Sequence, residues 1–440
     1  MKSEVGTAGA ATHAARTAAL TSLPRLWPWL ALVALAIVLP WIFYDWVRFR
    51  HDGFVVALVT QMAVMSIFSL SYNMLMGQTG LLSFGHAVFF GLAGYGTIHI
   101  MNVVGAGDVL IPEELVPLLG GLMGAGFAVL FGFPATRQRG TAFAMITLGL
   151  GELVSAAAVM FNGFFGGEGG VTSNRMLGTS LFGLSYGPSI QIYYLALAWA
   201  VIATVLMRLL TEVPLGRMAN ACRDNQERAQ FVGYDPRMVR FYQFVLAGFF
   251  AGIAGSLYAL TYEIITYDSV NSVMSAEALL MTYIGGVGVF WGPIIGAVLV
   301  TLLQSWVSLI SNSWQIYVGV LFIIMVIYAP GGIAGLILLH RPIWQAQRAR
   351  SLILPYIRLL PPALLAVAGF VGLVELASLA SGVSGNAKAI VLFGTKLDPH
   401  ALLHWVVALA LLIVGGLIAR TQGQALAARF TRVLEQVKPT

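Results

Sequence analysis

The segment from Gly77 to His86 gathers polar side chains and glycines inside an apolar stretch. Its polar residues are Gln78, Thr79, Ser83 and His86, and its glycines are Gly77, Gly80 and Gly85. Hydroxyl, amide and imidazole groups can exchange hydrogen bonds with a small polar solute, and the glycines predict an interrupted helix. A break inside a membrane is tolerated where the backbone faces protein or a water-filled cavity. The segment is therefore predicted to line a solute pathway. The alternative is close packing of small residues, with His86 as a packing residue.

Two carboxylates, Glu152 and Glu375, lie inside other apolar runs. A carboxylate within a membrane is costly, so such a position predicts a function by default. A hydrogen bond that bridges two helices would explain Glu152 equally well. We assign Glu152 to the predicted pathway, whereas Glu375 carries less weight because it lies in a separate C-terminal pair of apolar runs.

Residues 214–234 form a charged stretch that predicts a short amphipathic helix. Met218, Ala221, Cys222 and Phe231 can lie toward one side, and Gly233 is a natural C-terminal stop. Such a helix is suited to docking on a partner protein. The residues assigned to this role are Gly216, Arg217, Arg223, Asp224, Asn225, Glu227 and Gly233. A solvated connector, whose arginines only set the orientation in a membrane, is the alternative.

The sequence has few of the residues that other chemistry requires. It contains no G-x-x-x-x-G-K-[ST] segment to bind phosphates and no cluster with metal-ligand spacing. Its single cysteine, Cys222, excludes an intrachain disulfide. We expect a chain without enzymatic activity and without a metal or cofactor of its own.

Composition indicates what must position these residues. Of the 440 residues 58% are hydrophobic and 10% are charged, and the mean hydropathy is +0.84. Crossing a bilayer takes about 20 apolar residues in a helix. Apolar runs lie at 26–44, 54–74, 81–103, 116–134, 141–162, 190–209, 241–262, 277–310, 315–338, 363–382 and 401–419. The first run has no cleavage site behind it and is predicted to be an uncleaved span. The predicted fold class is an all-α polytopic membrane protein.

Basic residues predict the orientation of the spans. The connection 208–240 carries six arginines and is expected in the cytoplasm, which puts the glycine-rich loop 163–189 outside. The basic residues after 338 fit only if 277–310 folds back at Gly285 to Gly292, with Pro293 starting the returning helix. This gives a core of about ten spans and an appended C-terminal hairpin. The predicted parts are a cytoplasmic segment 1–25, the core 26–340, a basic linker 341–362, the hairpin 363–419 and a cytoplasmic tail 420–440.

Several motifs together resemble one known family. The charged stretch is followed by VLAGFFAGIAGSLYA at 245–259, and NMLMGQTGLLSFGHAVFFG stands at 73–91. Further pieces are TLGLGE at 147–152, GGEGGV at 166–171, GGVGVFWGP at 285–293 and APGGIAGL at 329–336. In this order and spacing, over about residues 54 to 338, they are similar to branched-chain amino acid ABC transporter permeases, most of all to the LivM-like branch. The C-terminal hairpin, Gln78-Thr79 and Phe84 depart from that pattern.

The resemblance implies a subunit of the bacterial inner membrane that passes branched-chain amino acids or a related small polar, amino-acid-like solute. It implies two cytoplasmic ATPase subunits, which bind ATP and Mg and press on 214–234. It also implies a second, homologous, LivH-like permease and a periplasmic solute-binding protein. Membrane lipid surrounds such a subunit, and the basic pI near 9.5 then reflects orientation and not nucleic acid. The alternative is an ion-coupled secondary transporter or channel.

Overall fold

The computed structural model describes residues 27–42, 44–45, 50–51, 53–107, 110–309, 311–346, 350–381, 391–392, 395–396 and 398–437. The predicted N-terminal segment 1–25 lies outside the described residues, as do 347–349 of the predicted linker and 438–440 of the predicted tail.

Long apolar helices dominate the described chain, and this confirms the all-α polytopic class. Among the described residues, eight helices are long and apolar enough to cross a membrane. They are α3 (Gly53–Thr79), α4 (Ala87–Gly105), the 3₁₀ turn η2 (Glu113–Leu115) with α5 (Val116–Ala135), α6 (Gly140–Met160), α8 (Ser189–Glu212), α11 (Pro236–Tyr262), α16 (Arg350–Ala380) and α17 (Leu402–Val437). A ninth arises if α14 (Trp314–Tyr328) and α15 (Gly332–Gln345), bent by 42°, form one span.

The remaining elements are short. The other helices are α2 (Trp27–Ile42), α7 (Asn162–Phe165), α9 (Pro214–Asp224), α10 (Gln226–Phe231), α12 (Ser272–Gly285) and α13 (Gly292–Val307), with 3₁₀ turns η3 (Gly167–Gly169), η4 (Arg175–Leu177) and η5 (Tyr267–Val270). Three two-residue strand pairs complete the set: β1 (Tyr44–Asp45) with β2 (Arg50–His51), β3 (Val171–Thr172) with β4 (Ile264–Ile265), and β5 (Val391–Leu392) with β6 (Thr395–Lys396).

The chain divides into two compact units, Met1–Ala276 and Glu277–Thr440. In the first unit α11 is central and packs against α3, α4 and α5. Small residues allow this close approach, because a Cβ on Gly124 of α5 would lie 2.3 Å from the Gly248 carbonyl oxygen of α11. The opposed backbones therefore leave no room for side chains at this crossing.

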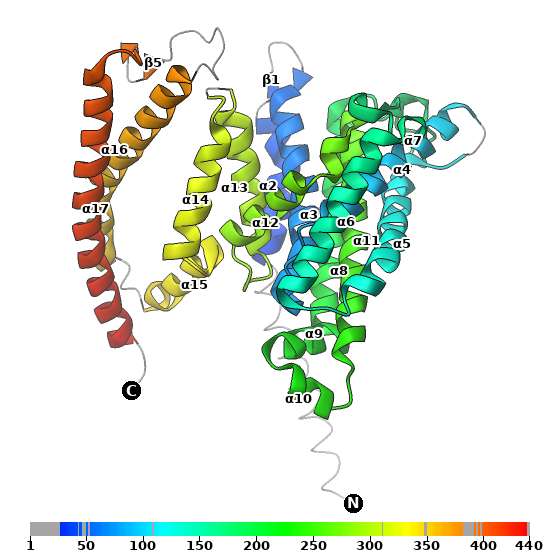
Figure 1. Ribbon diagram of the computed structural model, residues 1–440, viewed down its shortest axis with the longest axis horizontal. Helices are drawn as coiled ribbons and strands as arrows, with labels where there is room; N and C mark the ends of the chain where they lie inside the picture. Colours follow the sequence, from blue (N-terminus) through cyan, green and yellow to red (C-terminus); the bar gives the residue numbers. More distant parts are fainter. Residues whose placement is uncertain are drawn as a thin grey trace, which may run out of the picture. The chain divides into compact units, whose positions relative to one another are not determined.

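The first unit has two distinct ends. Figure 1 shows α9 and α10 together beyond the ends of α8 and α11, with α7 at the other end of the helices. We call these the α9 end and the β3 end, since β3 and its partner β4 follow α7 and α11 at the latter. α3 runs toward the α9 end and α11 away from it, so the two packed helices are antiparallel.

In the second unit, glycines shape a hairpin of short helices. α12 ends at Gly285 and α13 begins at Gly292, with Pro293 in its first turn, as the sequence predicts. A Cβ on Gly296 would lie 1.7 Å from the Met281 carbonyl oxygen, so the two helices touch backbone to backbone.

The C-terminal hairpin belongs to the same second unit. α16 and α17 pack along each other, and the Tyr317 hydroxyl of α14 donates a short hydrogen bond to the buried Glu375 carboxylate of α16. Residues 350–362 of the predicted linker lie within α16. This hydrogen bond joins α14 to α16 within the second unit.

Candidate solute pathway and coupling helices

The chain folds back immediately after α3. Gly80 has a left-handed φ of +69°, and the amides of Gly80 and Leu81 donate to the carbonyl oxygens of Met76 and Leu75 at 3.1 and 3.2 Å. The bond from Gly80 to Met76, with Gly80 in the left-handed conformation, is the αL ending, which glycine adopts without a Cβ penalty. The predicted helix over 81–103 therefore begins only at Ala87, and Gly77, expected to interrupt a helix, lies inside α3.

Residues 80–86, the fold-back segment, return along the last turns of α3. The His86 imidazole is fully buried, with its Nε2 2.9 Å from the Ser71 hydroxyl. Because Ser71 lies eight residues before the end of α3, the segment climbs about 12 Å back along that helix. The imidazole stacks on Phe68 with ring centroids 5.5 Å apart. One side of the His86 ring therefore packs against protein, as the alternative of a packing histidine predicts.

Close contact with α6 fixes the top of the fold-back segment. The Phe84 amide donates to the Thr147 hydroxyl at 3.2 Å, and a Cβ on Gly85 would lie 2.1 Å from the Thr147 carbonyl oxygen. On the other side, the Ala87 amide donates to the Ser275 hydroxyl at 2.9 Å. Only glycine fits at position 85, and α4 starts at a point held by two other elements.

Several buried polar atoms around this segment have no hydrogen-bond partner among the described residues. They are Gln78 Oε1, Ser83 Oγ and His86 Nδ1, together with Asn73 Oδ1 of α3 and both amide atoms of Gln243 of α11. Buried polar groups in folded proteins are nearly always bonded to protein or water. These atoms therefore mark places where water or a solute must supply the missing hydrogen bonds. Thr79 differs, because its hydroxyl donates to the Leu75 carbonyl within α3.

Glu152 lies apart from the buried polar atoms. Its neighbour Gly151 faces Gly85, but Glu152 itself is on the exposed side of α6, midway along the helix. A carboxylate at that depth does not face lipid without a large penalty. That side of α6 is therefore expected to meet water or another protein.

Two helices, not one, form the charged stretch at the α9 end. α9 ends at Asp224 and Asn225 caps α10, its side chain accepting from the Arg228 amide at 3.0 Å. Gly216 is buried, and Gly233 has a left-handed φ of +91° and follows α10, as expected of a stop. The prediction that Phe231 lies with the apolar side is wrong: it is 89% exposed, and Val232 is 70% exposed. The break at Asn225 rotates α10 away from the phase of a single helix.

Arg223 joins these helices to the predicted pathway. Its Nη1 donates a short hydrogen bond to the Gly77 carbonyl oxygen, and its Cγ lies 3.1 Å from where a Cβ on Gly80 would be. Its Nε also bonds Asp224 at 3.0 Å. Arg217, Asp224 and Glu227 are exposed. Arg223, although assigned to docking, thus contacts the end of α3 and the start of the fold-back segment.

The β3 end contains a polar network that sequence reasoning missed. The Arg175 guanidinium donates to four backbone carbonyl oxygens, those of Tyr186, Gly187, Leu260 and Thr261, at 2.7 to 3.3 Å. Its own amide donates to Glu263 at 2.9 Å. Glu114 accepts from Ser180, Leu181 and Tyr186. The sequence predicts that the loop around Gly166–Gly170 is external and flexible, meeting a periplasmic partner or covering the pathway, with a plain connector as the alternative. In the structure, hydrogen bonds of Arg175 and Glu114 hold residues 175–187 of this loop at several points.

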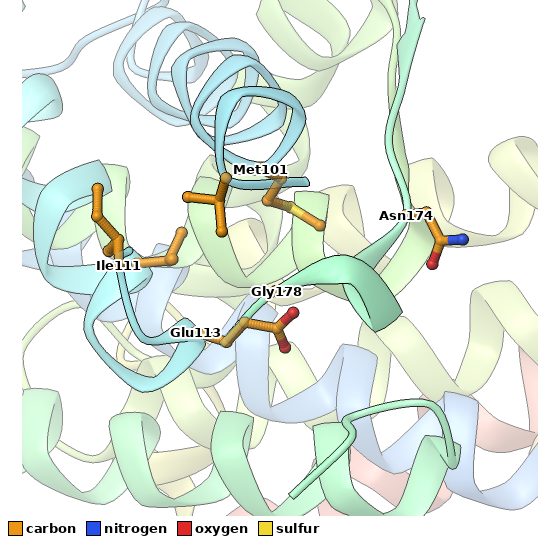
Figure 2. A pocket seen from close by; sticks show the side chains of 7 residues that line it. Met101, Ile111, Glu113, Asn174 and Gly178 are labelled. Atoms are coloured by element: carbon orange, nitrogen blue, oxygen red, sulfur yellow. The ribbon is translucent and has the colours of Figure 1, made fainter. Parts of the chain in front are cut away.

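Glu113, beside this network, is buried and differs from Glu114. Neither of its carboxylate oxygens has a hydrogen-bond partner in the described part of the chain. Figure 2 shows the carboxylate beside Gly178, and a Cβ on Gly178 would lie 2.1 Å from Oε1. The adjoining cavity of about 10 Å³, also lined by Met101 and Asn174, has room for about one water molecule. A single bound water would satisfy part of this carboxylate.

Comparison with known proteins identifies the family. The model of a family described as "Branched-chain amino acid transport system / permease component" matches residues 54–330. The chain belongs to this permease family. It is 27% identical, over 69% of its own length and 73% of the relative's, to the high-affinity branched-chain amino acid transport system permease protein LivM of Escherichia coli K12. The corresponding LivM of Salmonella typhimurium is 28% identical over 63% of this chain and 69% of the relative.

A probable LivM of Methanocaldococcus jannaschii is 23% identical over 61% of this permease and 89% of the relative. No solved structure matches. Both the family and the apolar helices make this permease a multi-pass inner-membrane transport component. All residues assigned to the pathway and to docking lie within the matched range, whereas α16 and α17 lie beyond it.

One stretch of the permease, GLSYG at 183–187, has the spacing of the nucleophile elbow of hydrolases. That elbow requires a sharp turn from a strand into a helix. Here the stretch is an irregular loop with Ser185 exposed, and α8 begins only at Ser189. The match in spacing therefore has no matching structure.

Proposed function

We propose that this permease passes branched-chain amino acids, or a related small amino-acid-like solute, along a route lined by the fold-back segment. The support is the set of buried atoms without partners on Gln78, Ser83 and His86. A zwitterionic solute that leaves water needs replacement donors and acceptors. Backbone in a broken region of a membrane helix can supply more of them.

Two cytoplasmic ATPase subunits, which bind ATP and Mg, would dock on α9 and α10. The observation behind this is the exposed apolar pair Phe231 and Val232, surrounded by charged side chains at the tip of the stretch. Exposed apolar groups rimmed by polar ones are typical of docking surfaces. A second, LivH-like permease would complete the pathway and cover the exposed face of α6 with Glu152. A periplasmic binding protein would deliver the solute at the β3 end.

Arg223 would transmit the movement of the ATPases. It bonds Gly77 at the end of α3 and touches Gly80 where the fold-back segment begins. A displacement of α9 would therefore pull on the segment that carries Ser83 and His86. No covalent chemistry on this chain is needed, because the energy comes from the partner subunits.

An ion-coupled transporter or channel is the competing function. It would need a route of ionisable groups through the spans. Glu375 is already bonded to Tyr317, and it belongs to a different unit from Glu152. The exposed Phe231 also has a direct use in a complex with an ATPase and none in a transporter that acts alone.

The test is uptake of labelled leucine into proteoliposomes that contain this permease with its partner permease, ATPases and binding protein. We expect uptake to require internal ATP and to persist when an ionophore abolishes ion gradients. Uptake that follows the ion gradient and ignores ATP would refute the proposal. Uptake of other amino acids in place of leucine would redefine the solute and leave the ATP dependence intact.

Single substitutions separate docking from transmission. Phe231→Ala and Glu227→Ala should weaken binding of the ATPases, because both side chains are exposed on α10. Arg223→Ala should leave the ATPases bound and hydrolysing ATP while uptake falls at least about tenfold, equivalent to about 1.4 kcal/mol of lost coupling. If Arg223→Ala instead releases the ATPases and Phe231→Ala does not, the two roles are assigned the wrong way round.

A further inference from the structure

Arg240, in the second turn of α11, is a buried residue whose Nε has no hydrogen-bond partner among the described residues. Arg240 is 6% exposed. Among the described residues, it takes part in no ion pair. Arginine is almost never buried without a compensating group, because the desolvation of the charge is not repaid. We therefore expect the complete assembly to bring a negative group to this position.

The charged groups around Arg240 increase this need. Arg139 and Arg237 lie close enough to act on it electrostatically, with the Cys222 thiol and Asp235 as the groups of opposite effect. The Asp235 carboxylate is already engaged as the cap of α11, where it accepts from the Arg237 amide at 2.8 Å. Among the described residues, Arg139 is hydrogen-bonded only to the neutral Gln226. The region thus keeps an excess of positive charge.

Aromatic rings place this charge at the edge of the apolar surface. Phe133 of α5 lies edge to face with Phe241 of α11, their centroids 6.4 Å apart, and the Arg137 guanidinium sits 4.3 Å over the Phe133 ring. Phe133 is 60% exposed and Tyr242 is 49% exposed. Exposed rings above a group of arginines, at the end of membrane helices, are the composition of the headgroup layer.

We propose that the phosphate of an anionic phospholipid headgroup binds where α5 ends and α11 begins, with Arg240 as the inner contact and Arg139 and Arg237 at the rim. The lipid is favoured over soluble phosphate because its acyl chains would lie against the exposed Phe133 and its neighbour Phe241. It is favoured over a protein carboxylate because these rings face the lipid-exposed side of α5 and α11, whereas Phe231 marks the docking tip.

Thermal unfolding of the intact importer complex in nanodiscs tests the site. Discs of phosphatidylcholine alone are compared with discs containing phosphatidylglycerol, for the wild type, Arg240→Gln and the control Arg358→Gln, which changes an exposed arginine of α16. We expect phosphatidylglycerol to raise the unfolding midpoint of the wild type and the control by about 2–4 °C. Arg240→Gln should show no such rise. In phosphatidylcholine it should unfold at the same temperature as the wild type or higher, since an unpaired buried charge is gone.

Three results would overturn the proposal. Equal loss of stability by Arg240→Gln in both kinds of disc would mean that a protein group is the partner. An equal rise on adding inorganic phosphate to phosphatidylcholine discs would mean that the site does not select lipid. If Arg240→Gln does not assemble, native mass spectrometry of the wild type decides: no preferential retention of phosphatidylglycerol over phosphatidylcholine contradicts the site.

Discussion

The two ends of the first unit treat buried polar groups in opposite ways. At the β3 end, Arg175 donates to four carbonyl oxygens and Glu114 accepts from three residues, so both side chains are saturated. At the α9 end, Gln78, Ser83 and His86 are just as buried but have atoms without partners among the described residues. The β3 end has exceptions, since Ser173 Oγ, Thr179 Oγ1 and both carboxylate oxygens of Glu113 also have no partner among the described residues; Glu113 lies beside a cavity for about one water.

This difference separates a fixed part from a part that can exchange partners. A saturated network holds one arrangement, because any movement breaks several hydrogen bonds at once. Groups with missing partners lose less when they move and gain when a solute or water arrives. Under the proposed function, we therefore expect the β3 end to act as a rigid frame and the fold-back segment to change its contacts during transport.

Removing the centre of the fixed network should have the largest effect on stability. Arg175→Ala leaves carbonyl oxygens of the loop and of α11 without donors, so we expect a loss of at least about 3 kcal/mol. Uptake should fall with it, because the loop detaches. Thermal unfolding of the purified complex measures the first effect. Arg175→Lys, which keeps the charge but offers fewer donors, should recover part of the loss; an unfolding midpoint unchanged in Arg175→Ala would contradict the network's role.

A methyl group at the fold-back segment should have the next largest effect. Gly85→Ala drives a Cβ against the Thr147 carbonyl of α6, and overpacking of this kind destabilises by about 1–3 kcal/mol. The matched control is Gly149→Ala on α6, where nothing lies within 4 Å of the new Cβ. Because alanine favours a helix over glycine, the control should be neutral or stabilising by up to about 1 kcal/mol. Equal unfolding midpoints for the two variants would show that the segment is not packed on α6.

The smallest effect concerns the native cysteine at the α9 end. Burial raises the pKa of the Cys222 thiol above its usual value. The thiolate is the reactive form, so a raised pKa leaves less of it at pH 7. We expect slow reaction with a maleimide at pH 7 and a rate that increases about tenfold per pH unit below the pKa. A rate at pH 7 equal to that of a free thiol would contradict the burial of this side of α9.

Local patterns predicted what depends on short stretches of chain. Hydropathy gave the helices, and Gly80, Gly285 and Gly233 marked real ends or turns because their backbone conformations or close contacts require glycine. Gly77 did not break α3, since a packed helix tolerates a glycine whose carbonyl is bound from outside. Phe231 was misplaced because a cap at Asn225 changes the helical phase.

Contacts distant in sequence could not be predicted in this way. Arg223 meets Gly77 across 146 residues, and Arg175 meets Thr261 across 86. In the sequence, each arginine has a simpler explanation. Arg223 lies in a connection whose positive charge sets the orientation in the membrane, and Arg175 lies in a polar loop. Only the folded chain shows that Arg223 contacts the end of α3 and that Arg175 contacts the end of α11.

The most direct test of this account is the accessibility of a cysteine at Ser83 or Thr79 in a Cys222→Ala background. Both positions are buried in the structure. If the fold-back segment lines the pathway, a small hydrophilic thiol reagent should label both, and solute-loaded binding protein with ATP should change the rate severalfold. The Arg223→Ala substitution should abolish that change. Slow labelling at both positions, with the same rate in every state, would contradict the pathway and leave membership of the family untouched.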